Sequence, residues 1–272
     1  MVTLGVGQRT DVIVQGLSNP KGAYFIRSNA TCAEAKQPYA LAALYYQDAP
    51  PTALPTSVAS DPPSTSCDND PLGTTVPMYP IAITNPDQTY TLNLTAGQNA
   101  SSVWLWSINS SSFRADLSQP VLMQAQTGNL TFPPQWNVVN TGSAGSYRVI
   151  FNNNSPLPHP MHFHGHNMQI LAVGRGKWDG TTIVRPSNPQ RRDVQIVPEF
   201  GYLVWQTFAD NPGAWAFHCH VAWHAATGLS VDFLEQPAKI KGLPIPASLD
   251  QTCKEWEAVV ATGQIQQLDS GV

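Results

Sequence analysis

Short apolar runs, separated by glycine, proline and asparagine, dominate the middle of the chain. These runs are rich in β-branched and aromatic residues, a composition typical of short strands. They comprise residues 90–95, 103–108, 147–151, 168–173, 201–208 and 229–234. Repeated short strands with turn residues between them predict an all-β fold, a sandwich or barrel of antiparallel strands.

A helix is expected near the C-terminus. Thr252 and Glu255 have the spacing of a capping box, in which the two side chains satisfy backbone N–H groups at the start of a helix. Cys253, Trp256 and Val260 then share one face of that helix, which we expect to face inward.

The two ends of the chain suggest a division into domains. Residues 7–14 (Gly-Gln-Arg-Thr-Asp-Val-Ile-Val) have the character of a strand inside a domain. Residues 50–79 are rich in proline, serine and threonine and are interpreted as a linker. We therefore expect residues 1–49 to end one domain, residues 80–240 to form a complete domain, and residues 241–272 to form a tail with a short helix.

Composition excludes several classes of protein. Charged residues make up 12% of the 272 residues, about half of the usual share of roughly 25%, which argues against a charged helix bundle or a coiled coil. The net charge is −4 and no dense basic patch is present, so nucleic acid is not an expected partner. No apolar run approaches the ~18 residues of a membrane span, so no membrane partner is expected either.

Glycosylation signals indicate a secreted protein. Six Asn-x-Ser/Thr sequons occur, at Asn29, Asn93, Asn99, Asn109, Asn129 and Asn153. Cys32 and Cys67 flank a polar, proline-containing loop, and a disulfide there would contribute about 3–4 kcal/mol; two unpaired thiols are the alternative. Because no signal peptide is visible, we expect the natural N-terminus to lie upstream of Met1.

The histidines carry the most specific signal. All seven lie between positions 159 and 224, in the clusters His159-Pro-Met-His-Phe-His-Gly-His166 and His218-Cys-His-Val-Ala-Trp-His224. An isolated histidine is usually structural, because imidazole has many roles. Seven in two clusters, one of them with a cysteine, instead predict metal binding.

Strand geometry divides the second cluster between two sites. Successive side chains of an extended segment face opposite sides. His218 and His220 therefore point one way and Cys219 the other, so one tripeptide serves two metal sites. The thiolate site is completed by two imidazoles, in the set His159, Cys219 and His224. Two imidazoles and one thiolate suit a trigonal blue-copper centre, with Leu229 at the place of the weak axial ligand.

The same alternation in the first cluster supplies a second metal site. Four neutral imidazoles share the other face: His162, His164, His218 and His220. His166 has the same parity, but we interpret it as a structural residue or one that orients a ligand through a hydrogen bond.

Two other uses of these residues fit less well. A structural zinc site normally has four Cys/His donors with closely spaced cysteines, and those spacings are absent. A catalytic thiol at Cys219 would leave the flanking histidine pair without a purpose.

With these residues in view, the chain resembles the multicopper oxidases, and among them the fungal laccases of ascomycete type. Both histidine motifs match the two C-terminal copper motifs of that family. Residues 7–14 resemble the end of the family's second cupredoxin domain, and the final Asp269-Ser-Gly-Val272 resembles its C-terminal plug. Three further segments also resemble the family: Trp106-Ser-Ile-Asn109, Pro120-Val-Leu122 and Asn211-Pro-Gly-Ala-Trp215. The resemblance implies a cupredoxin-like Greek-key β-sandwich or barrel, preceded by the end of a second cupredoxin domain.

The resemblance also assigns roles by position. His159, Cys219 and His224 match the type 1 copper ligands, with Leu229 axial. His162 matches a type 2 ligand, and the type 3 ligands are matched by His164, His218 and His220. The family oxidises phenols in one-electron steps at type 1 copper through the imidazole that matches His224. The electrons pass through Cys219 and its flanking histidines to a trinuclear copper cluster, where dioxygen is reduced to water.

The chain departs from the family in its first half. Family members take half of their eight cluster histidines from a first domain, and no histidine precedes His159 here. The type 1 set is therefore complete and the type 2 and type 3 sets are partial, so we expect missing N-terminal cupredoxin domains as partners. The resemblance also implies that Cys253 pairs with a first-domain cysteine. We interpret the chain as the C-terminal half of a laccase-like benzenediol:oxygen oxidoreductase.

Two other classes of function are compatible with these residues. The chain alone could be a copper-binding or electron-transfer fragment without turnover. The parent oxidase could use another reductant: a phenol of secondary metabolism, ascorbate or Fe(II). Carboxylates near His224 would favour Fe(II), and the neighbouring Ala222, Ala225 and Ala226 provide none.

Overall fold

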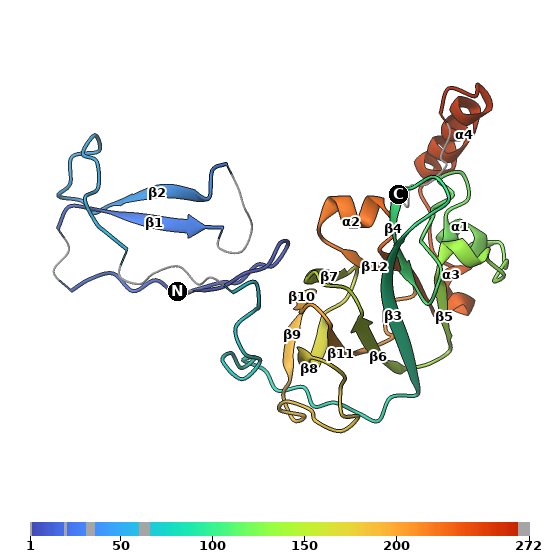
Figure 1. The fold of residues 1–272 in the computed structure, drawn as a ribbon, viewed down its shortest axis with the longest axis horizontal. Coiled ribbons are helices and arrows are strands. Elements are labelled where there is room, and N and C mark those ends of the chain that lie inside the picture. The colour runs from blue at the N-terminus through green and yellow to red at the C-terminus, as the bar shows by residue number, and fades with distance from the viewer. Residues whose placement is uncertain (1, 19–20, 31–35, 60–65, 266–272) are drawn as a thin grey trace. The chain divides into compact units, whose positions relative to one another are not determined.

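A computed structural model describes the chain except for residues 1, 19–20, 31–35, 60–65 and 266–272 (Figure 1). The described chain forms two compact units. Residues 1–4 and 9–68 make the first unit, and residues 5–8 and 69–272 make the second. The domain limits expected from the sequence stay predictions.

The first unit contains one antiparallel hairpin. Strand β1 (Ala23–Asn29) pairs with β2 (Tyr39–Tyr45) in a continuous register from Ala23 opposite Tyr45 to Asn29 opposite Tyr39. Every residue of β2 is exposed. A two-stranded hairpin by itself buries little apolar surface and is at best marginally stable in water.

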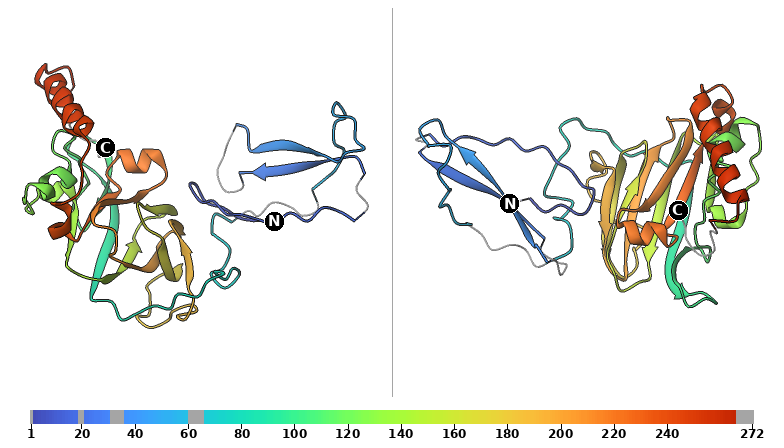
Figure 2. Two further views of the ribbon diagram at one scale, coloured as in Figure 1. Left: turned by 180° about the vertical axis from the view of Figure 1, so that it is seen from behind. Right: turned by 90° about the horizontal axis from the view of Figure 1, so that it is seen from above.

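The second unit is an open sandwich of two sheets (Figures 1 and 2). The five-stranded sheet has the order β10 (Val194–Val197), β7 (His159–Phe163), β12 (Gly213–Cys219), β13 (Ser230–Glu235), β5 (Val138–Gly142). The six-stranded sheet has the order β4 (Trp104–Ile108), β3 (Gln88–Gln98), β6 (Ser146–Asn153), β11 (Gly201–Phe208), β8 (Met168–Arg175), β9 (Gln190–Arg192). Neighbours are antiparallel except for β13 with β5 and β3 with β6, which are parallel. The predicted all-β, cupredoxin-like fold is confirmed as a sandwich that does not close into a barrel.

The core lies between the two sheets. Alternate residues of β6, namely Tyr147, Val149 and Phe151, are completely buried, as period-two alternation requires. They pack against Phe217 and Phe233 of the other sheet in one apolar cluster. Burial of this face fixes the register of the strands, because a slip by one residue would turn the apolar side chains to solvent.

Helices occupy the connections and the C-terminus. They are α1 (Val121–Gln126), the 3-10 turn Pro134–Trp136, α2 (Ala222–Ala226), α3 (Pro237–Ile240) and α4 (Ala247–Ala261). None of the helices in the described part of the chain has the length and hydropathy that a membrane crossing requires.

Three expectations about local structure need correction or stay open. The capping box at Thr252 is wrong: α4 begins at Ala247, directly after Pro246, and the Thr252 hydroxyl donates to the carbonyl of Ser248 inside the helix. Residues 7–14 form no strand. The expected partner of Cys67, Cys32, lies outside the described residues, so that disulfide stays a prediction.

Candidate metal centres

The two histidine clusters meet on adjacent strands. Strands β7 and β12 are antiparallel, with His162 directly opposite His218 and Met161 opposite Cys219. Because consecutive side chains of a strand face opposite sides, this register places His162 and His218 on the outer face of the sheet. Cys219 turns to the inner face and joins the core cluster.

One group of donors contains the cysteine. The Nδ1 atoms of His159 and His224 lie 3.1 Å apart, and Cys219 Sγ lies 3.7 Å and 3.5 Å from them. His159 is in β7, Cys219 ends β12, and His224 lies in α2. Three elements therefore direct three donor atoms at one point.

The spacing of these atoms fits one metal ion. Bonds of about 2.05 Å to nitrogen and about 2.3 Å to sulfur, at ~120° to one another, would separate the nitrogens by about 3.6 Å and each nitrogen from sulfur by about 3.8 Å. The observed separations differ from these by about half an ångström or less. Two imidazoles and one thiolate at this spacing match the donor set of a trigonal blue-copper centre.

Burial keeps these donors uncharged before a metal binds. Desolvation, followed by the nearby His224, lowers the pKa of His159 to about 3. Desolvation also raises the pKa of the Cys219 thiol to about 12, and burial lowers the pKa of His224. Neutral imidazoles are the form that coordinates metals, and a cation at this point would stabilise the thiolate that the apolar surroundings disfavour.

Neighbouring groups fix this set. The Trp106 ring contacts the rings of both His159 and His224, with centroids 4.6 Å and 4.8 Å away. Ser155 Oγ lies 3.0 Å from His159 Nε2, the ring nitrogen that points away from the donor group, so this nitrogen is hydrogen-bonded to the serine. Leu229 is completely buried, and its carbonyl accepts a hydrogen bond from the Cys219 N–H. Leu229 therefore lies next to the cysteine and presents no donor atom in its side chain.

A second group of donors lies on the outer face. The Nε2 atoms of His164 and His218 are 2.9 Å apart, and His162 offers a ligand atom to the same cluster. The opposite nitrogens are engaged: His162 Nδ1 donates to the Asp193 carbonyl at 2.9 Å, and His218 Nδ1 to the Cys219 carbonyl at 2.9 Å. Such hydrogen bonds fix the orientation and tautomer of metal-binding imidazoles. Burial, then nearby histidines, lowers the pKa of His164.

The fourth imidazole expected on this face, His220, lies beside the three-histidine cluster. Its ring centroid is 5.6 Å from that of His162 and 6.1 Å from that of His218. The His220 ring thus lies near the rings of His162 and His218, but its nitrogens do not belong to the group formed by His162, His164 and His218.

His166 points away from both clusters and into the core. Its Nε2 donates to Glu235 Oε2 at 3.2 Å, and its Nδ1 donates to the His164 carbonyl at 3.0 Å. Although burial alone would lower it, the pKa of His166 is raised because Glu235 accepts its hydrogen bond and carries the opposite charge. Sequence reasoning missed Glu235. Glu235 stands two residues after Phe233 and four after Val231, so the alternation of side chains along this strand could have indicated that it faces the core.

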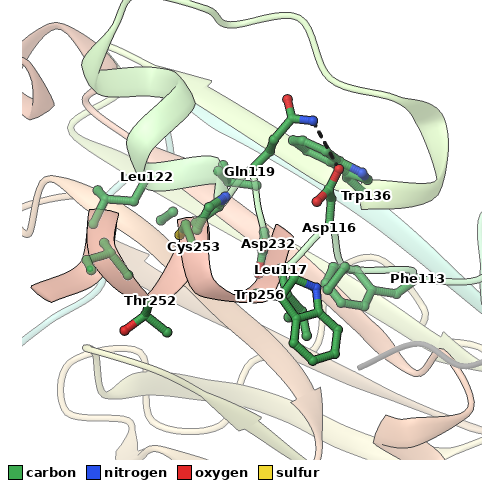
Figure 3. A pocket seen from close by; sticks show the side chains of 15 residues that line it. Phe113, Asp116, Leu117, Gln119, Leu122, Trp136, Asp232, Thr252, Cys253 and Trp256 are labelled. Carbon is green, nitrogen blue, oxygen red and sulfur yellow. Dashed lines mark hydrogen bonds between the residues drawn. The ribbon is translucent and has the colours of Figure 1, made fainter. Parts of the chain in front are cut away.

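A separate cavity opens beside α4 (Figure 3). It has a volume of about 480 Å³ and is lined mainly by apolar side chains, including Phe113, Trp136 and Trp256. Asp232 and Cys253 also line it, and none of the candidate metal ligands does. Desolvation raises the pKa of Asp232 to about 6.

Known proteins resemble the chain over its whole length. The sequence model of the multicopper oxidase family matches residues 84–239. Laccase-2 of Podospora anserina is 32% identical over 99% of this chain and 47% of that protein, and Laccase-1 of Botryotinia fuckeliana is 32% identical over 100% and 49%. The crystal structure of a laccase from Botrytis aclada superposes with a TM-score of 0.78 at 28% identity, over 92% of this chain and 47% of that chain. The chain thus spans about half the length of the curated relatives it matches.

Proposed function

Since this chain belongs to the multicopper oxidase family, we propose that it supplies the type 1 copper site and part of the trinuclear copper site of a laccase-type oxidase. The substrates we propose are phenols or other small aromatic reductants, with dioxygen as the oxidant. Bound copper would supply the one-electron redox chemistry and the reduction of dioxygen to water. The remaining ligands, in this proposal, come from N-terminal cupredoxin domains.

One observation carries the proposal: two donor groups meet at consecutive residues. Cys219 Sγ belongs to the group with His159 and His224, while His218 Nε2 belongs to the group with His162 and His164. One peptide unit therefore joins the groups, and the hydrogen bond from His218 Nδ1 to the Cys219 carbonyl forms a second connection at 2.9 Å. A short covalent link suits electron transfer from a site of substrate oxidation to a site of oxygen reduction.

The two imidazoles of the first group differ in exposure. His159 is completely buried, whereas His224 is half-buried in α2 and its neighbour Trp223 is 80% exposed. An aromatic reductant can therefore approach the His224 edge. The Trp106 ring packs against both imidazoles, and Leu229, whose carbonyl accepts the Cys219 N–H, is completely buried.

Secretion is also part of the proposal. The sequons of the sequence, apart from the one at the buried Asn153, and the predicted pairing of Cys32 with Cys67 support it. The fungal proteins of similar sequence are named as laccases.

Copper loading tests the first part of this proposal. Purified chain should take up Cu²⁺ and show the intense visible absorption of a copper–thiolate bond, and Cys219→Ser should abolish it. Survival of that absorption in the Cys219→Ser variant would contradict the ligand assignment. A matched control is Cys253→Ser, because Cys253 is the other free buried cysteine among the described residues and lines the separate cavity.

A second candidate function is copper binding without turnover. The number of histidines favours it. All seven histidines lie in the two clusters, and His166 is hydrogen-bonded to Glu235. The chain therefore has fewer histidines than the eight that the family uses for its trinuclear cluster. Oxygen uptake in the presence of a phenol separates the candidates. Blue colour without uptake supports the binding function for this chain, and turnover by this chain refutes it.

A further inference from the structure

A histidine and a carboxylate lie buried side by side, the histidine two residues beyond His164 in the chain. The His166 side chain is 3% exposed and the Glu235 side chain 0% exposed, and their closest N–O distance is 3.2 Å. The other carboxylate oxygen of Glu235 accepts a hydrogen bond from the Tyr147 hydroxyl at 2.5 Å. Tyr147 is itself completely buried. Strands β6 and β13 and the loop after β7 therefore meet in one polar chain inside the sandwich.

Stability alone does not account for this polar chain. Taking an acidic and a basic side chain out of water is expensive, and well-packed apolar residues often replace such a buried pair without loss of stability. Here the surroundings are aromatic. The centroid of the His166 ring lies 4.8 Å from that of Phe163, in a stacked arrangement, and 5.7 Å from that of Trp215, in a T-shaped arrangement. Buried pairs are retained in some proteins because they specify one conformation.

The conformation specified here is that of the His164–His166 loop. The second nitrogen of His166, Nδ1, donates to the carbonyl of His164, and the His164 N–H donates to the carbonyl of Ala216 on β12. Gly165 between them has φ +67°, and a Cβ there would lie 2.6 Å from the Trp215 ring. The chain thus reverses at Gly165, with His166 turned inward and His164 turned outward.

We propose that the Glu235–His166 pair is a positioning device that holds His164 for metal binding, with Tyr147 fixing the carboxylate. Glu235 anchors one nitrogen of His166, and the other nitrogen holds the backbone carbonyl of His164. The imidazole of His164 then meets His218, Nε2 to Nε2, at 2.9 Å. The metal-binding role of His164 rests on the proposed function, whereas the effect of Glu235 on its conformation does not.

Three variants test the device. Glu235→Gln keeps the shape of the side chain and removes its charge. The triple variant Tyr147→Phe, His166→Phe, Glu235→Met replaces the whole polar chain with apolar groups of similar size, so the fold survives while the anchor is lost. Glu199→Gln is the matched control, because Glu199 forms an exposed ion pair with Arg175.

The first measurement uses the metal-free chain. Nuclear Overhauser contacts between the ring protons of His164 and His218 are expected in the unchanged chain and in Glu199→Gln. We expect them to be lost in the triple variant and weakened in Glu235→Gln. The proposal is overturned if these contacts persist in both the triple variant and Glu235→Gln, or if the unchanged chain does not show them. Loss of folding in both variants also overturns it, since the pair would then be a requirement of the fold.

The second measurement is a Cu²⁺ titration of the same chains, followed by electron paramagnetic resonance. We expect about 10- to 100-fold weaker binding at the three-histidine group in the triple variant, with the copper–thiolate absorption at Cys219 unchanged. A change at both groups would indicate a general structural effect and contradict positioning. If the unchanged chain binds no Cu²⁺ at the three histidines, that part of the proposed function fails, while the metal-free measurement still decides the role of Glu235.

Discussion

Gly7 lies directly against the imidazole of His220. A Cβ at Gly7 would come within 2.5–2.7 Å of the His220 ring, and the φ of Gly7 is +80°. The neighbouring Gln8 holds this segment in place, because its amide donates to the Val194 carbonyl at 2.8 Å and to Asn69 Oδ1 at 2.9 Å. The segment of residues 5–8 therefore covers the one expected ligand that stands beside the three-histidine group.

Gly7→Ala is expected to displace the His220 ring. The added methyl group overlaps the ring, and the left-handed backbone adds about 1 kcal/mol of strain. We expect weaker Cu²⁺ binding on the outer face of the sheet, measured by titration, and unchanged copper–thiolate absorption. The matched control is Gly22→Ala, at the same φ of +80° with no atom within 4 Å. Equal effects of the two substitutions would assign the loss to backbone strain alone.

Leu229→Met is expected to lower the reduction potential of the copper–thiolate site. Leu229 is buried beside Cys219 and offers no donor atom, whereas a methionine sulfur would stabilise the oxidised, more highly charged ion. Redox titration of the blue absorption measures the change. An unchanged or higher potential would show that residue 229 does not face the metal.

Period-two alternation explains how much of the site could be predicted. Because the side chains of a strand face alternate sides, the sequence alone separated Cys219 from His218, and the structure places them in different groups. The partners that orient the rings were not predictable. The Asp193 carbonyl and Ser155 hydroxyl reach the histidines through tertiary packing, and nothing in their local sequence marks them.

Tertiary context also explains the errors about local structure. Residues 12–14 have high β-propensity, but this propensity reflects packing against neighbouring strands. In the described part of the chain they form no strand pairing, and Ile13 is 100% exposed. The hairpin of β1 and β2 was missed in the same unit. In the second unit, where both sheets bury one face, predicted strands such as residues 201–208 match the observed limits of β11.

Asn153 is expected to carry no glycan in folded molecules, although it stands in a sequon. It is 1% exposed, and its side-chain N–H groups donate to the carbonyls of Leu157 and Pro198 at 2.7 Å and 2.8 Å. Asn129 is the matched comparison, because it is exposed; its side-chain N–H donates to Gln124 Oε1, and its Oδ1 accepts from the Thr131 N–H. After expression in a eukaryotic secretory host, peptide mass spectrometry should find glycan at Asn129 and none at Asn153. A glycan on Asn153 in folded chain would contradict the buried position.

Asp232 is expected to make the chain less stable as the pH rises from about 4 to about 6. Its carboxyl group lines the apolar cavity beside α4, and desolvation raises its pKa from 3.8 to about 6. A folded state that holds its proton more tightly than the unfolded state loses stability when the pH passes from the unfolded to the folded pKa. The shift corresponds to about 2–3 kcal/mol. Asp232→Asn removes the charge, so its free energy of unfolding in urea should exceed that of the unchanged chain at pH 7 and converge with it near pH 4. The same difference at both pH values would mean that Asp232 ionises freely in the folded chain.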